Sequence, residues 1–132
     1  MTRKTTVWIG WVLSAIPIGM MLFSAAMKLN PSPQVIEFTD KHLGYPATAF
    51  MPLAILEITC VVVYAIPQTA VLGAILMTAY LGGAVASHFR VGDMPIPQVL
   101  LGVLAWAGLY LRDERLRALL PLRKPSVVSH QP

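Results

Sequence analysis

Four long apolar stretches dominate the sequence and limit what the chain can fold into. They cover approximately residues 7–27, 50–66, 70–88 and 96–111. A helix needs about 20 predominantly apolar residues, or about 17 at the short end, to cross the hydrocarbon core of a bilayer. The first three stretches meet this requirement, and the fourth lies close to its lower limit. The pattern therefore predicts four transmembrane helices.

Composition supports the same conclusion. Hydrophobic residues make up 56% of the 132 residues and charged residues only 12%, and a soluble domain this short cannot bury so much apolar surface. The turn at residues 67–69 is so short that the second and third stretches must be antiparallel neighbours. We therefore predict an all-α fold, an integral membrane up-down four-helix bundle. It forms a single domain over residues 1–132 with a disordered tail at 122–132.

The distribution of basic residues predicts the orientation, because Lys and Arg gather in cytoplasmic segments. If the N-terminus is cytoplasmic, only Lys28, Lys41 and Arg90 lie outside. Seven basic residues then lie inside: Arg3, Lys4, Arg112, Arg115, Arg117, Arg123 and Lys124. We predict a multi-pass protein of the cell membrane with both termini cytoplasmic. The net charge of +4 thus indicates the lipid bilayer as a partner and argues against nucleic acid.

The first stretch has an alternative interpretation as a signal peptide, because Arg3 and Lys4 precede it and small residues follow its apolar part. Its apolar core of about 20 residues exceeds the usual length of about 7 to 15. This favours a membrane helix and leaves cleavage as the alternative. Pro17 lies inside the stretch and frees a backbone carbonyl that a neighbouring helix must cover. We therefore expect this helix to face protein at that depth.

Two further features concern the connections and the packing. Residues 29–47 form the longest connection, with a helical-looking centre at 34–43, and we expect a lid over the outer end of the bundle. Gly73, Gly82 and Gly83 leave the third stretch with a surface almost free of side chains, which permits close helix approach. We therefore expect the helix at 70–88 to be the central one.

Polar side chains from three stretches should meet in the outer half of the bundle. Glu57 lies about seven residues below the start of its helix, hence about 10 Å deep at 1.5 Å per residue. A carboxylate at that depth is costly unless it is protonated, hydrogen-bonded or paired. We predict a ligand site whose members are Lys28, Glu57, Tyr80, His88 and Arg90. Glu57 and His88 are the candidate catalytic groups.

Each of these residues also has a purely structural interpretation. Lys28 and Arg90 lie near helix ends, where long basic side chains extend to water. His88 suits a hydrogen-bonded histidine at the membrane surface, and Glu57 suits a polar clamp between helices. Cys60 is the single cysteine, which excludes an intramolecular disulfide or a CxxC pair. The three histidines lie on opposite sides of the predicted bundle, so we expect no metal site.

Four ordered segments carry a family resemblance: FSAAMKLN, LAILEITCVVVYAIP, YLGGAVASHFR and VLAWAGLYLRDERLRALLPLR. Together they resemble the DoxX-like family of small four-helix membrane proteins over nearly the whole chain. The family is named after the small subunit of an archaeal thiosulfate:quinone oxidoreductase, and other members are linked to membrane-associated redox or thiol-stress systems. The resemblance implies that Lys28, Glu57 and His88 occupy recurring polar positions. Ala25 replaces a glycine of the family, and the single Cys60 argues against dithiol chemistry.

Two functions fit these features. The first is an auxiliary subunit of a membrane redox or thiol-stress system, which acts with a redox partner protein and receives a lipophilic molecule such as a quinone. Lys28, Tyr80 and His88 would donate hydrogen bonds to the quinone carbonyls beside Glu57. The second is a stand-alone membrane enzyme that isomerises or opens a ring of a lipophilic substrate, with Glu57 and His88 handling protons. A proton-linked transporter would require a homo-oligomer, because four helices are few for that role.

Overall fold

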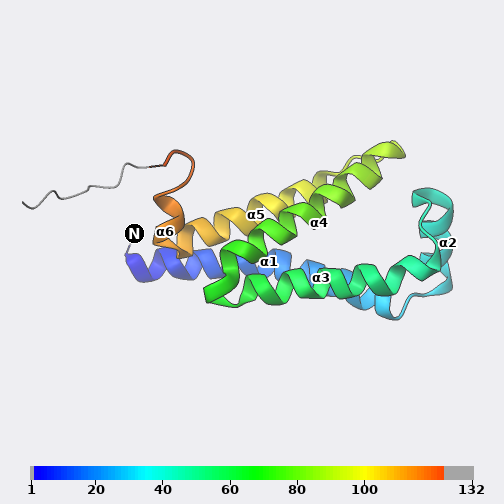
Figure 1. Cartoon of the computed structure of the whole chain (residues 1–132), viewed down its shortest axis with the longest axis horizontal. Coiled ribbons are helices and arrows are strands. Elements are labelled where there is room, and N and C mark those ends of the chain that lie inside the picture. Colours follow the sequence, from blue (N-terminus) through cyan, green and yellow to red (C-terminus); the bar gives the residue numbers. More distant parts are fainter. Residues whose placement is uncertain (1, 124–132) are drawn as a thin grey trace, which may run out of the picture.

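The computed structural model describes residues 2–123, which fold into helices (Figure 1). The long helices are α1 (Arg3–Leu29), α3 (Phe50–Ala65), α4 (Ala70–Arg90) and α5 (Ile96–Arg112). The short elements are α2 (Pro33–Phe38), η1 (Thr39–Leu43), η2 (Ala47–Ala49), η3 (Pro67–Thr69) and α6 (Glu114–Arg117). No strand occurs within residues 2–123, so the predicted all-α fold is confirmed. The predicted disordered tail lies outside the described residues from residue 124 onward.

Local signals determine where the helices begin and end. The Thr2 side chain accepts a hydrogen bond from the Thr5 backbone N–H at 3.2 Å and caps the start of α1. Ser32 caps α2 in the same way, with Pro33 in the first turn. Gly92, in the turn after α4, has a φ of +85°, a left-handed conformation that glycine adopts without strain. The apolar stretches therefore become helices with defined ends.

The long helices make their main contacts in a cyclic order, α1–α3–α4–α5 and back to α1. The N-terminus, η3 and α6 lie toward one end of the molecule, and α2 and the α4–α5 turn lie at the other (Figure 1). We call these the α6 end and the α2 end. Pro17 is buried, as expected for a helix that neighbours cover at that depth.

The most extensive helix contact joins α1 to α5. A Cβ atom on Gly108 would lie 2.8 Å from the Gly10 carbonyl oxygen and from the Ser14 backbone nitrogen, so glycine permits this approach. Gly82 and Gly83 are exposed, and no atom lies within 4 Å of a Cβ built on either. The predicted close approach is found at Gly73, where a Cβ atom would overlap the backbone of Tyr64 on α3. The prediction that the helix at 70–88 is central is wrong, because Gly82 and Gly83 face outward and the most extensive helix contacts are those of α1 with α5 and α3.

Apolar side chains cover the outside of the helices as well as the interior. The buried interior includes Met21, Tyr64, Met77 and Leu109. The exposed apolar side chains include Trp8, Ile16, Phe23, Ile55, Leu72, Ile75, Leu100 and Val103. Among the described residues, three spans are long and apolar enough to cross a membrane: Arg3–Leu29, Ala47–Ala65 and Pro67–Arg90. Helix α5 is apolar but shorter, at 17 residues. Helices that are apolar on every side are typical of a lipid environment.

Candidate functional site

The acid predicted on α3 is held between three helices. Glu57 is only 2% exposed. Its Oε2 atom accepts a hydrogen bond from Lys28 Nζ on α1 at 2.8 Å and another from the Tyr80 hydroxyl on α4 at 3.2 Å. The ion pair and the phenol hydrogen bond offset the cost of burying the carboxylate. We call Lys28, Glu57 and Tyr80 the Glu57 cluster.

The Glu57 cluster retains unused hydrogen-bonding capacity. Both hydrogen bonds end on Oε2, and within residues 2–123 no group donates to Oε1. Lys28 Nζ also donates to Ser24, one turn earlier on α1, which leaves one of its three N–H groups free. The Lys28 side chain is 21% exposed, so the cluster is open on that side. It therefore offers one acceptor, one donor and a carboxyl group that can carry a proton.

Two of the five predicted residues lie apart from this cluster, at the end of α4. His88 Nδ1 lies 3.1 Å from Asp93 Oδ2, and His42 Nε2 on η1 lies 2.7 Å from the same oxygen. Arg90 donates to the Leu43 carbonyl oxygen at 2.7 Å. We call His42, His88 and Asp93 the Asp93 cluster. It joins the connection between α1 and α3 to the end of α4.

The two clusters occupy different depths. His88 follows Tyr80 by eight residues on α4, which corresponds to about 12 Å along the helix axis at 1.5 Å per residue. The structure thus brings Lys28 and Tyr80 to Glu57 and places His88 and Arg90 nearer the α2 end. Of the four residues predicted to share the site with Glu57, Lys28 and Tyr80 contact it, and His88 and Arg90 do not.

The connection contributes polar residues that sequence reasoning missed. The Tyr45 hydroxyl lies 2.6 Å from Ser87 Oγ, and His42 belongs to the Asp93 cluster. The two contacts join residues that are 42 positions apart for Tyr45 and Ser87 and 51 positions apart for His42 and Asp93, so no local pattern pairs them. The only available signal was the concentration of Ser87, His88 and Asp93 at the end of an apolar stretch, since such groups need partners.

Asp93 is charged at neutral pH. Hydrogen bonds from His42, and then from His88, hold the pKa of the Asp93 carboxyl below its usual value of 3.8. A carboxylate can only accept hydrogen bonds. The two contacting nitrogens, Nε2 of His42 and Nδ1 of His88, must therefore each carry a hydrogen.

A second buried polar group lies toward the α6 end. The Ser14 hydroxyl, fully buried on α1, donates to the Gly10 carbonyl oxygen at 2.8 Å. Arg112 Nε on α5 donates to Ser14 Oγ at 3.1 Å, and the Tyr64 hydroxyl on α3 lies 2.9 Å from that oxygen. The Arg112 guanidinium lies 4.0 Å from the centroid of the Trp11 ring. Sequence reasoning counted Arg112 only as a cytoplasmic charge and did not find this group, which links α1, α3 and α5.

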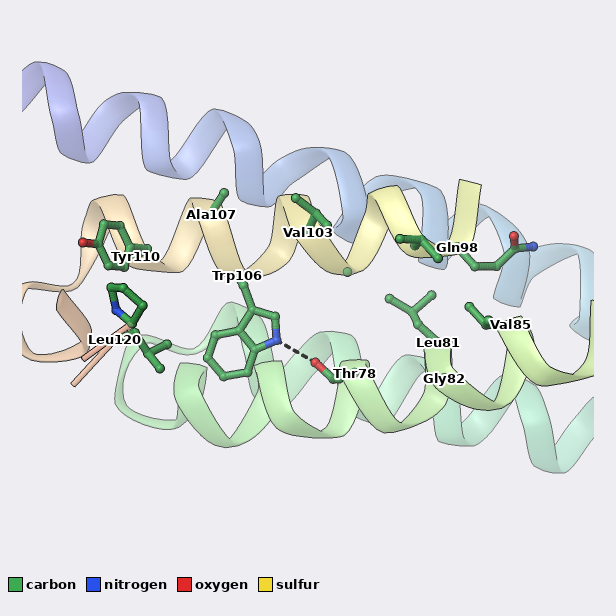
Figure 2. Close-up of a pocket in the computed structure, with 13 residues that line it drawn as sticks. Thr78, Leu81, Gly82, Val85, Gln98, Val103, Trp106, Ala107, Tyr110 and Leu120 are labelled. Carbon is green, nitrogen blue, oxygen red and sulfur yellow. Dashed lines mark hydrogen bonds between the residues drawn. The ribbon is translucent and has the colours of Figure 1, made fainter. Parts of the chain in front are cut away.

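An apolar groove of 680 Å³ runs between α4 and α5 (Figure 2). Trp106 Nε1 on α5 donates to Thr78 Oγ1 on α4 at 2.7 Å, as the dashed line in Figure 2 marks. Leu81, Val85 and Val103 are among the apolar side chains that line it. None of the five predicted site residues lines this groove, so it is separate from the Glu57 cluster.

Cys60 is buried and carries a free thiol. Within residues 2–123, no group of three or more His, Cys, Asp or Glu side chains has an arrangement suited to a metal ion.

The family comparison was made for the whole chain, whose apolar helices carry the polar clusters described above. The model of the DoxX-like family matches residues 12–108. The chain belongs to the DoxX-like family. The matched range includes every residue of the Glu57 and Asp93 clusters, and family membership identifies this DoxX-like protein as a membrane protein. Comparison with curated proteins and with solved structures gave no significant match.

Proposed function

We propose that this DoxX-like protein is an auxiliary subunit of a membrane redox or thiol-stress system. In this proposal the Glu57 cluster binds the polar head of a lipophilic molecule such as a quinone. In this proposal the chain acts beside a redox partner protein and can form homo-oligomers. The single observation that carries the proposal is the buried Glu57 carboxylate, held by Lys28 at 2.8 Å and Tyr80 at 3.2 Å.

The chemistry of the Glu57 cluster suits a quinone. A quinone carbonyl accepts hydrogen bonds, and Lys28 Nζ has a free N–H. Quinone reduction consumes protons, and Glu57 Oε1 is the carboxyl oxygen that accepts no hydrogen bond within the described part of the chain. A carboxyl group in an apolar setting can serve as a proton donor and acceptor for a neighbouring ligand. Binding therefore requires Glu57 itself and the donors that orient it.

The proposal places the four long helices in the cell membrane as an up-down bundle with both termini cytoplasmic. The Lys and Arg distribution makes the α2 end the outer one, because Lys28, Lys41 and Arg90 are the only basic residues outside in that orientation. The Glu57 cluster then lies in the outer half of the bundle. The exposed apolar side chains of all four helices face lipid.

Binding of a short-chain benzoquinone to the purified protein in lipid nanodiscs tests this function. We expect saturable binding by wild type, and a Kd about tenfold weaker for Glu57→Gln and for Tyr80→Phe, because each loses a hydrogen bond or a charge worth about 1 to 2 kcal/mol. Glu37→Gln is the matched control. Glu37 also pairs with a lysine, Lys41 at 2.6 Å, but this pair is exposed. A folded Glu57→Gln protein that binds quinone like wild type contradicts the proposal.

A stand-alone enzyme is the alternative, and the same preparation addresses it. Direct proton exchange between Glu57 and His88 is disfavoured, because His88 lies about 12 Å beyond Tyr80 along α4 and its Nδ1 is engaged with Asp93. Lys28 and Tyr80, which contact Glu57, would have to exchange protons with it instead of His88. Chemical conversion of a lipophilic substrate by the purified chain, without any partner protein, would favour the enzyme over the auxiliary subunit.

A further inference from the structure

The connection between α1 and α3 is attached to the end of α4. We call residues 30–49 the lid segment. Three of its residues reach α4 or the turn that follows it: His42 contacts Asp93 at 2.7 Å, the Leu43 carbonyl accepts from Arg90 at 2.7 Å, and Tyr45 contacts Ser87 at 2.6 Å. These contacts are polar, and they are partly buried or exposed. They are therefore the kind of interaction that can open and close without unfolding the helices.

The lid segment lies at the α2 end of the molecule, and the Glu57 cluster lies deeper, about midway along α3 and α4. Covalently it leads from the end of α1, just past Lys28, to the start of α3, seven residues before Glu57. Its polar contacts then reach α4 about 10 Å beyond Tyr80, since Ser87 follows Tyr80 by seven residues. It thus joins the three helices that supply Lys28, Glu57 and Tyr80. Figure 1 shows α2 standing beyond α3 at the same end as the α4–α5 turn.

Asp93 has a special position among these contacts. A single carboxylate oxygen, Oδ2, receives His42 from the lid segment and His88 from α4. The His42 ring is oriented by stacking on Phe38 of the same segment, with ring centroids 4.9 Å apart. Hydrogen bonds to a charged acceptor are stronger than neutral ones, so Asp93 should contribute more to closure than the Tyr45–Ser87 contact.

We propose that residues 30–49 form a closed lid that shields the Glu57 cluster from water at the α2 end, and that Asp93 is the residue that holds it closed. The lid makes the Glu57 cluster reachable chiefly from the lipid side while Asp93 engages both histidines. Asp93 is a positioning residue here, because it acts on the cluster only through the lid. The use of the shielded site by a ligand rests on the proposed function, whereas the closure itself does not.

Thiol labelling and amide hydrogen exchange test the lid in nanodiscs without quinone. In a Cys60→Ala background, Ser24→Cys reports access to the Glu57 cluster, because Ser24 contacts Lys28. We expect Asp93→Ala to raise the labelling rate of Ser24→Cys by a water-soluble maleimide about tenfold, because it removes the charge-assisted hydrogen bond between Asp93 and His42 of the lid segment. Amide exchange in residues 33–43 should rise by a similar factor. Glu37→Ala removes a lid carboxylate that contacts Lys41 and not α4, and it should change neither rate.

Tyr45→Phe provides a second variant, because it removes one hydroxyl and leaves the turn after α4 intact. It should raise both rates, but less than Asp93→Ala does. Unchanged labelling and exchange in both variants would overturn the lid, even if quinone binding by wild type is intact. Conversely, if the labelling rates respond as expected but the wild-type protein binds no quinone, the lid is supported and the proposed function is contradicted.

Discussion

At the scale of single residues, burial and pairing determine what each polar group contributes. Glu57 is almost fully buried and depends on Lys28, whereas Lys28 lies near a helix end with a partly exposed side chain. The two partners are therefore not equivalent. A lysine that loses its acid can extend toward water, but a buried carboxylate that loses its lysine cannot.

Substitutions in the Glu57 cluster should show this asymmetry. Glu57→Gln should cost less stability than Lys28→Ala, by roughly 1 to 3 kcal/mol, because only Lys28→Ala strands a buried charge. Thermal unfolding in detergent, followed by circular dichroism, measures the difference. His88→Ala should stay within about 1 kcal/mol of wild type, since His88 bonds to a partly exposed Asp93 and not to Glu57. A His88→Ala protein as unstable as Lys28→Ala would show that the histidine supports Glu57 after all.

Asp93 should make stability depend on acid pH. Its pKa in the folded protein is below the usual 3.8, so the carboxylate stabilises the fold above that value and loses this effect as pH falls through the lowered pKa. The gap in unfolding temperature between wild type and Asp93→Ala should be present at pH 5 and shrink as pH falls below 3.8. Asp40→Ala, at an exposed lid residue, is the control. A gap that is unchanged at pH 3 would contradict the pairing with His42 and His88.

At the scale of elements, small residues matter only where another helix faces them. Gly108 on α5 lies against the backbone of α1, whereas Gly82 on α4 opens into the groove of Figure 2. Sequence reasoning treated all glycines of 70–88 as packing residues. Gly73 is one, against Tyr64 of α3, but Gly82 and Gly83 are not, because glycine content alone does not reveal which helix face is covered. The short turn at residues 67–69, in contrast, could be predicted from the sequence, because turn formation depends on local residues.

A pair of alanine substitutions separates these two kinds of glycine. Gly108→Ala should destabilise the protein by about 1 to 3 kcal/mol, because its Cβ would lie 2.8 Å from backbone atoms of Gly10 and Ser14 that cannot move aside. Gly82→Ala should be neutral or stabilising by up to about 1 kcal/mol, since alanine favours helix and its Cβ meets no atom within 4 Å. Unfolding midpoints in one detergent provide the comparison. Equal losses in both variants would contradict the contact between α1 and α5.

At the scale of the whole molecule, the long helices could be predicted from the sequence. The side-chain contacts between them could be predicted only in part. The apolar stretches marked all four long helices, because helix formation in an apolar chain follows from local sequence. Glu57 and Tyr80 lie at similar depths on neighbouring helices, so the sequence suggested that they would meet. The contacts of His42 and Tyr45 could not be foreseen, since they depend on how a 20-residue connection folds back on α4.

Topology reporters test the proposed orientation of the whole chain. A reporter that works only in the cytoplasm should be active when fused after Pro132, and one that works only outside should be active when inserted near Thr39. The reason is that seven of the ten basic residues belong to segments that the proposed orientation assigns to the cytoplasm. A fusion within the turn at 67–69 should behave like the one after Pro132. The reverse pattern would place the lid segment and the Glu57 cluster on the cytoplasmic side.

The hydroxyl of Ser14 has a consequence for how the family can diversify. It donates to Gly10, accepts from Arg112, lies against Tyr64 and leaves no room for a side chain at Gly108. A larger residue at position 14 would require simultaneous changes on two other helices. Among relatives, positions 14, 64, 108 and 112 should therefore change together or not at all, whereas the residues that line the groove between α4 and α5 are free to drift one at a time.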